Sequence, residues 1–177
     1  MSKSDRLPEE SFLNSYYAPG DYMDTFSASL EDRQDLQTAD IRVLAAHILN
    51  AEIGWINALL KVRDVIVRPL GMKTTSDLAQ EQLQVPLEAK QPGDRIGFFR
   101  VYRVTEHEII LGEDDWHQDF RMSIFRKTGP KPGVFTSTCC KRHNLFGHVY
   151  LALILPVHKK IAVAVLENAT AQELTAA

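Results

Sequence analysis

The chain has 177 residues, which is enough for one domain with a single hydrophobic core. Hydrophobic residues make up 45% and charged residues 24%, as in ordinary globular proteins, and these values exclude a disordered or fibrous chain. With 20 Lys and Arg against 23 Asp and Glu, the net charge is −3, so the chain is expected to be soluble and no nucleic-acid partner is expected.

Three features indicate a cytoplasmic protein. The first ten residues are charged and lack the apolar core of a signal peptide. Cys139 and Cys140 are neighbours whose side chains would point to opposite faces of a strand, so we expect two free thiols, as in a reducing compartment. The longest uninterrupted apolar run, residues 149–157, falls short of the about 20 apolar residues that cross a membrane, so no membrane span is predicted.

The first half of the chain predicts an arm, a strand and two helices. Residues 1–20 are polar and aperiodic, and we expect an arm that is partly ordered at best. Alternating apolar positions from residue 21 predict a strand, and Thr38 or Asp40 can cap a helix that begins at Ile41. A second helix is predicted over residues 55–66. Residues 72–92 are irregular, and a short strand, a short helix or a mobile lid is expected there.

The second half predicts a meander followed by one long helix. Four strand-like segments, at residues 95–104, 108–111, 116–127 and 134–143, are joined by short polar links, which is typical of antiparallel hairpins. Asn144 can then cap an amphipathic helix that runs to about residue 174 and is kinked at Pro156. The β-branched content of residues 149–155 leaves a strand as the alternative there.

This order of elements predicts an α+β fold. A curved antiparallel sheet is covered on one face by the long C-terminal helix, with two short helices after the first strand. Residues 1–20 form the arm and residues 21–174 a single domain. A sheet that curls around one helix tends to leave an apolar hollow between the two, and small molecules bind in such hollows.

Five motifs carry a family resemblance: DVIVRPLG at residues 64–71, GDRIGFF at 93–99, LGEDDWHQDFR at 111–121, HNLFGHVY at 143–150 and ILPVH at 154–158. Together and in this order they resemble the bacterial domain-of-unknown-function family 2867, over about residues 20–170. That family is similar in turn to the START-like, pollen-allergen-like helix-grip superfamily, whose members enclose a ligand cavity between sheet and helix. The resemblance implies a helix-grip fold for residues 21–174 and no established activity.

Some relatives carry this domain behind a dehydrogenase-like nucleotide-binding domain. This chain has no Gly-x-Gly-x-x-Gly turn, so NAD binding is not carried over and no cofactor is predicted.

Residues 112–121 hold the densest group of ionisable side chains. In an extended strand, Asp115, His117, Asp119 and Arg121 share one face with Ser123. Three interpretations remain open: a cross-strand ladder of ion pairs, a polar wall that orients a ligand or moves a proton, and a metal site made from Asp115, His117 and Asp119. Elsewhere, His143, His148 and His158 are expected to be surface or capping residues.

The leading functional hypothesis is a protein that binds a small apolar or amphipathic ligand between the sheet and the C-terminal helix. The candidate lining is aromatic and aliphatic: Phe98, Tyr102, Trp116, Phe120, Tyr150 and Leu153. The alternative is an enzyme that moves protons on a carbonyl-containing ligand, with His117 or Asp119 as base and Arg121 as electrostatic stabiliser. A third possibility is an accessory domain of an oxidoreductase. No oligomeric state is predicted.

Overall fold

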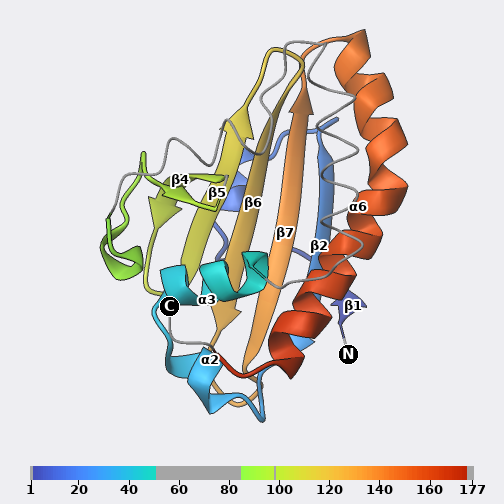
Figure 1. Cartoon of the computed structure of the whole chain (residues 1–177). Coiled ribbons are helices and arrows are strands. Elements are labelled where there is room, and N and C mark those ends of the chain that lie inside the picture. Colours follow the sequence, from blue (N-terminus) through green and yellow to red (C-terminus); the bar gives the residue numbers. More distant parts are fainter. Residues whose placement is uncertain (1, 51–84, 98, 175–177) are drawn as a thin grey trace.

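The computed structural model describes residues 2–50, 85–97 and 99–174. Within these residues, seven strands form one antiparallel sheet in the order β1-β2-β7-β6-β5-β4-β3 (Figure 1). The strands are β1 Lys3–Ser4, β2 Tyr22–Ser29, β3 Arg95–Ile96, β4 Phe99–Val104, β5 Glu108–Asp114, β6 Gln118–Lys127 and β7 Gly133–Arg142. The predicted second helix and most of residues 72–92 lie outside the described residues, as does Phe98.

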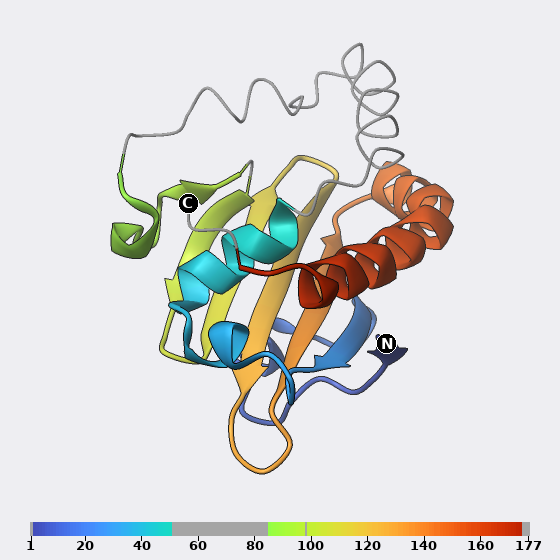
Figure 2. The same cartoon turned by 60° about the horizontal axis from the view of Figure 1, so that its bottom comes forward.

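The two longest described helices pack on one face of the sheet. They are α1 Leu13–Tyr16, α2 Gln34–Thr38, α3 Ile41–Leu49, the 3-10 turn η2 Leu87–Ala89 and α6 Leu145–Ala171. Figure 2 shows α3 and α6 on the same face, which we call the helix side. Residues 2–17 cross the opposite face, which we call the arm side. The predicted α+β helix-grip arrangement is confirmed.

The core on the helix side follows from the alternation of apolar residues in the strands and from the helical spacing of apolar residues in α3 and α6. Alternate residues of the strands, such as Ile109, Leu111 and Ile124, are fully buried beneath the apolar stripe of α3 and the C-terminal part of α6. Leu44 of α3 and Leu166 of α6 are each 0% exposed. Burying one such side chain stabilises a fold by about 1.5–3 kcal/mol, so this layer fixes both helices on the sheet.

β5 extends three residues beyond its predicted end at residue 111. The prediction stopped there because Gly112 is typical of a turn. Gly112 instead pairs with Arg121 of β6 and with Arg100 of β4. A Cβ atom at Gly112 would lie 2.1 Å from the Phe120 carbonyl oxygen, so the close approach of β6 requires glycine. Conversely, β6 begins only at Gln118, because the Gln118 carbonyl accepts a hydrogen bond from the Asp115 amide in a tight turn.

The start of α6 is fixed by Asn144, as the sequence predicts. Its Oδ1 accepts a hydrogen bond from the Gly147 amide at 2.9 Å, while its Nδ2 donates to the Trp116 carbonyl at 3.2 Å. One side chain thus caps the helix and ties it to the turn that precedes β6.

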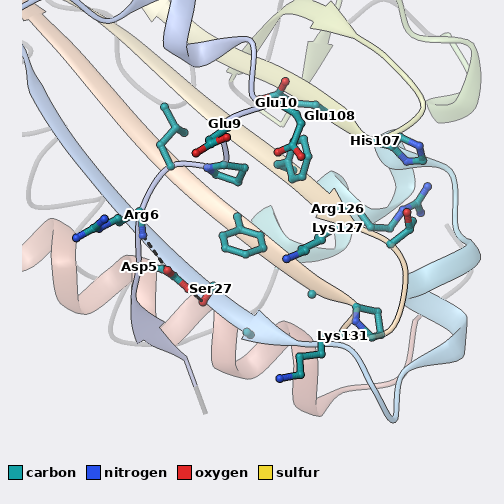
Figure 3. A pocket seen from close by; sticks show the side chains of 18 of the residues that line it. Asp5, Arg6, Glu9, Glu10, Ser27, His107, Glu108, Arg126, Lys127 and Lys131 are labelled. Atoms are coloured by element: carbon teal, nitrogen blue, oxygen red, sulfur yellow. Dashed lines mark hydrogen bonds between the residues drawn. The ribbon is translucent and has the colours of Figure 1, made fainter.

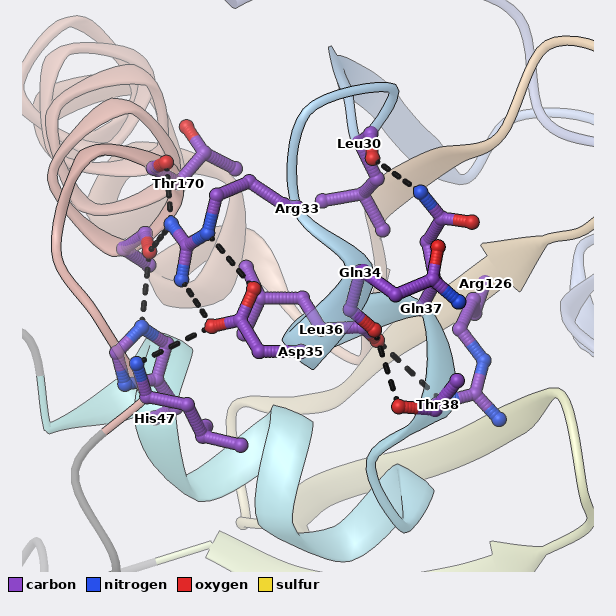
Figure 4. Close-up of polar contacts among 12 residues, drawn as sticks. Leu30, Arg33, Gln34, Asp35, Leu36, Gln37, Thr38, His47, Arg126 and Thr170 are labelled. Atoms are coloured by element: carbon purple, nitrogen blue, oxygen red, sulfur yellow. Dashed lines mark hydrogen bonds and ion pairs between the residues drawn. The ribbon is translucent and has the colours of Figure 1, made fainter.

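The end of α6 is held by two basic side chains, one directly before α2 and one in α3. The Arg33 guanidinium donates to the carbonyls of Ala169 and Thr170 and forms a two-pronged ion pair with Asp35 (Figure 4). His47 Nε2 donates to the Ala169 carbonyl at 2.8 Å. Because the last carbonyls of a helix lack partners within the helix, donors placed there anchor its end.

The arm is more ordered than its polar sequence predicts. β1 pairs with β2, and Leu13 is 1% exposed against the arm side of the sheet. The buried Glu108 carboxylate accepts hydrogen bonds from Ser11 Oγ, the Phe12 amide and Ser123 Oγ. An isolated carboxylate is costly to bury, so these three donors make Glu108 the latch that holds the arm on the sheet.

Candidate functional site

Arg121, a predicted site residue, lies on the arm side of the sheet. Its Nη1 donates to Asp114 Oδ1 at 2.6 Å, and its guanidinium carbon lies 3.5 Å from the ring centre of Tyr102 and 5.0 Å from that of Tyr16. Burial alone would raise the pKa of Asp114, but hydrogen bonds from Arg121 and Tyr102 outweigh it, so that pKa lies below its usual value. The group joins β5, β6 and the arm in one cation–π and ion-pair contact.

His117 does not join this group, and Asp119, opposite Asp114 in the register of β5 and β6, lies at its edge. Asp119 lies 3.2 Å from His143 Nε2, an ion-pair distance across the end of β6. His117 is 2% exposed, with its ring edge-on to Tyr150 at 4.8 Å and its Nδ1 3.7 Å from Asp115. In the part of the chain that the structure describes, no three His, Cys, Asp or Glu side chains gather as metal ligands.

The candidate apolar lining separates into different places. Phe120 lies on the helix side of β6, and Tyr150 of α6 is half-buried against His117. Tyr102 belongs to the arm-side cluster, whereas Trp116 is 52% exposed and Leu153 is 73% exposed on α6. Of the five described residues, Phe120 and Tyr150 remain between sheet and helix.

A polar cluster that the sequence did not single out joins β2 to α6. The Tyr22 hydroxyl donates to Asp24 Oδ2 at 2.5 Å, and His158 Nε2 lies 3.3 Å from the same oxygen. The side chains of Asp24 and His158 are 11% and 25% exposed. Burial, and then the hydrogen bond to Asp24, raise the pKa of Tyr22. A carboxylate is therefore held largely out of water between sheet and helix.

Two signals for this cluster were present in the sequence. Asp24 falls on the apolar face of a predicted half-buried strand, where a carboxylate needs partners. His158 lies in the predicted C-terminal helix that covers the sheet, so it is a possible partner for such a carboxylate. What joins the two is the lateral position of α6 beside β2, which the helical period does not specify.

The sheet next to this cluster carries apolar side chains that keep some exposure. Across β7, Asp24 is in register with Thr138 and then Met122 of β6, whereas Tyr22 is in register with Cys140 and then Phe120. Met122 and Phe120 are half-buried, while Ile124 one step further along is 0% exposed. Neighbouring strands lie about 4.8 Å apart, and β7 lies between β2 and β6. The Asp24 carboxylate is therefore two strand spacings, or about 10 Å, from this apolar surface.

A pocket of about 1190 Å³ lies on the arm side, where the arm crosses the end of the sheet (Figure 3). Phe125 and Phe135 contribute aromatic walls, and its rim carries charges of both signs, including Lys127 and Glu9. Its most buried polar group, Glu108, already binds the arm. Because the buried polar group of this pocket serves the arm's attachment, we regard the helix side as the better candidate.

α6 is long and apolar enough to cross a membrane by length and composition alone. An 18-residue window has a mean hydropathy of 1.8, and 11% of it is buried. The expectation of no span rests on the longest uninterrupted apolar run, residues 149–157, which includes Pro156 and ends before His158. An average over the helix also counts the apolar residues beyond Lys159 and Lys160.

Comparison with known proteins identifies a family and no activity. No curated protein and no solved structure matches the chain. The profile of a family described as "Protein of unknown function (DUF2867)" matches residues 18–165, which span β2 to the last third of α6. With this share of its length matched, the chain belongs to the DUF2867 family of proteins of unknown function.

Proposed function

We propose that this protein binds a small amphipathic molecule on the helix side of the sheet, between the sheet and α6. The observation that carries the proposal is the Asp24 carboxylate, 11% exposed and shared by Tyr22 from the sheet and His158 from the helix. Ligand sites are mostly apolar surfaces with a few convergent polar groups, and this cluster beside Phe120 and Met122 has that composition.

The chemistry of the cluster indicates which end of a ligand it would hold. Tyr22 and His158 both approach Asp24 Oδ2, and Oδ1 lies 3.5 Å from His158. Oδ1 can accept a further hydrogen bond. We therefore propose a ligand with a hydroxyl or amino donor about 10 Å from an apolar part, the separation of Asp24 from the β6 surface.

The helix-grip fold supports kinship with START-like proteins as a proposal. We further propose that binding occurs in a reducing, cytoplasmic compartment, because both cysteines are free thiols.

Two measurements test the proposal. Native mass spectrometry of the gently purified protein should show a discrete organic adduct that Asp24→Asn reduces. In addition, NMR titration with octylamine and 1-octanol should shift backbone amides of β2, β6 and α6. Asp119→Asn is the matched control, because it makes the same change on the arm side of the sheet. If no adduct is found and neither probe shifts those amides, or if both variants behave alike, the proposal fails.

A further inference from the structure

We infer that the outer face of α6 docks on an anionic lipid surface. This outer face consists of Leu145, Val149, Leu153 and Val157, spaced at every fourth residue. Their exposed fractions are 81%, 53%, 73% and 37%. From first to last they extend about 18 Å along the helix. An apolar stripe of this length on one helix, left in contact with water, is typical of an interaction surface.

A tryptophan extends this surface beyond the start of the helix. Trp116 is 52% exposed and stacks on Phe146 with ring centres 5.0 Å apart. The hydrogen bond from Asn144 to its carbonyl fixes the turn that carries it. Tryptophan beside exposed leucine and valine is the composition of helices that lie in the boundary between lipid headgroups and acyl chains.

The charges on the helix favour an anionic partner. Between residues 145 and 166, α6 carries no Asp or Glu. Its cationic residues in that span are Lys159 and Lys160, both exposed and directly beyond the apolar stripe. The chain as a whole is negative, at −3, so this local excess of positive charge is a property of the helix and not of the protein. An apolar stripe that ends in lysines matches acyl chains beneath anionic headgroups.

The inner face of α6 argues for a helix that lies on the surface without crossing it. Leu151, Leu166 and Ala169 are 5%, 0% and 1% exposed against the rest of the protein. Arg33 and His47 hold the last carbonyls of the helix. Crossing a bilayer would break these contacts and bring two lysines into the hydrocarbon, whereas peripheral docking leaves them intact.

The same charges disfavour a second copy of this chain as the occupant. In a two-fold dimer the same patch meets itself, so Lys159 and Lys160 of both copies would border one apolar seam. Between residues 145 and 166, α6 of the other copy has no Asp or Glu to pair with them, so the seam would lack complementary charge. A lipid surface meets the apolar stripe and the lysines together.

Vesicle flotation tests the inference. The purified protein is mixed with vesicles of phosphatidylcholine alone or of phosphatidylcholine with about 30% phosphatidylserine as the anionic lipid. We expect flotation with the anionic vesicles, and about tenfold weaker binding for Leu153→Glu and for the double variant Lys159→Glu, Lys160→Glu. Lys127→Glu with Lys131→Glu is the matched control, because both lysines are exposed and lie on the hairpin between β6 and β7.

Three results would overturn the inference. One is no flotation with anionic vesicles. Another is equal loss of binding in the control variant, which would reduce the effect to net charge. The last is a dimer in sedimentation that Leu153→Glu abolishes, or a loss of folding stability that Leu153→Glu causes, both without lipid, because either would show that protein already covers the stripe.

Discussion

Two glycines occupy positions where a neighbouring carbonyl excludes a side chain. Gly112 lies in β5 against the Phe120 carbonyl, and Gly147 lies in the first turn of α6. A Cβ atom at Gly147 would be 2.2 Å from the His117 carbonyl oxygen. The backbone of α6 therefore touches the turn that precedes β6, and this contact sets how closely the helix approaches the sheet.

Replacing Gly147 by Ala should destabilise the protein, although Ala normally favours a helix by about 1 kcal/mol over Gly. The added methyl group meets a backbone oxygen that cannot rotate away, and overpacking of this kind costs about 1–3 kcal/mol. Urea unfolding followed by circular dichroism measures the change. His148→Ala, at the next and exposed position, is the control and should be near neutral. A Gly147→Ala variant more stable than the wild type would contradict the close contact.

At the scale of elements, the arm depends on one buried carboxylate. Glu108 of β5 receives its donors from Ser11 and Phe12 of the arm and from Ser123 of β6. Asp5 adds a second attachment through Ser27 of β2. The hydrogen bond from Ser27, with that from the Arg6 amide next, keeps the pKa of Asp5 below its usual value.

Replacing Glu108 by Ala should release the arm. Three donors, two of them buried, lose their acceptor. Each buried group left unsatisfied costs about 1–3 kcal/mol, partly offset because the carboxylate no longer has to be buried. We expect a loss of stability of about 2–4 kcal/mol and tryptic cleavage at Arg6 about tenfold faster or more. Glu106→Ala, an exposed carboxylate two residues earlier, is the control. Unchanged cleavage at Arg6 would show that Glu108 is not the latch.

Most elements could be predicted from sequence because their local rules agree. Asn144 was identified as a cap and does cap α6, and the alternation in β2 gives the observed strand. The predicted strand boundaries were wrong where a contact with another strand determines the residue, as the contact of Gly112 with β6 does. The site was only partly predictable. Arg121 and Asp119 share a face of β6 as the alternation predicts, but which layer covers that face is a tertiary matter, and the arm covers it.

At the scale of the whole molecule, the two neighbouring cysteines lie on opposite sides of the sheet. Cys139 belongs to the arm-side cluster with Leu13, and Cys140 pairs with Tyr22 in the register of β2. Both are free and buried. Burial raises the pKa of Cys139 to about 11 and that of Cys140 to about 12. Neither is expected to react as a thiolate while the sheet is intact.

Alkylation with iodoacetamide at pH 8 should therefore be slow in the native protein and should reach both cysteines in urea. Because the unfolded thiols have pKa values of about 8.5, the unfolded state releases protons first as pH rises. The contribution of the two thiols to stability should be constant below about pH 8.5 and should be lost progressively as pH rises towards 11. Urea midpoints at pH 7 and pH 10 measure this fall, which Cys140→Ala should lessen. Native labelling as fast as labelling in urea would contradict the buried positions.

β1 covers a short part of β2, pairing through Lys3 and Ser4 with two of its eight residues. Among the residues that the structure describes, β2 is otherwise the outer strand of the sheet on this side, and a strand without a neighbour offers its backbone amides and carbonyls to any other extended chain. Those few residues therefore shield a place where copies of the protein could join strand to strand. A loosened arm would invite such assembly, so resistance to aggregation depends on the arm's attachment as well as on net charge.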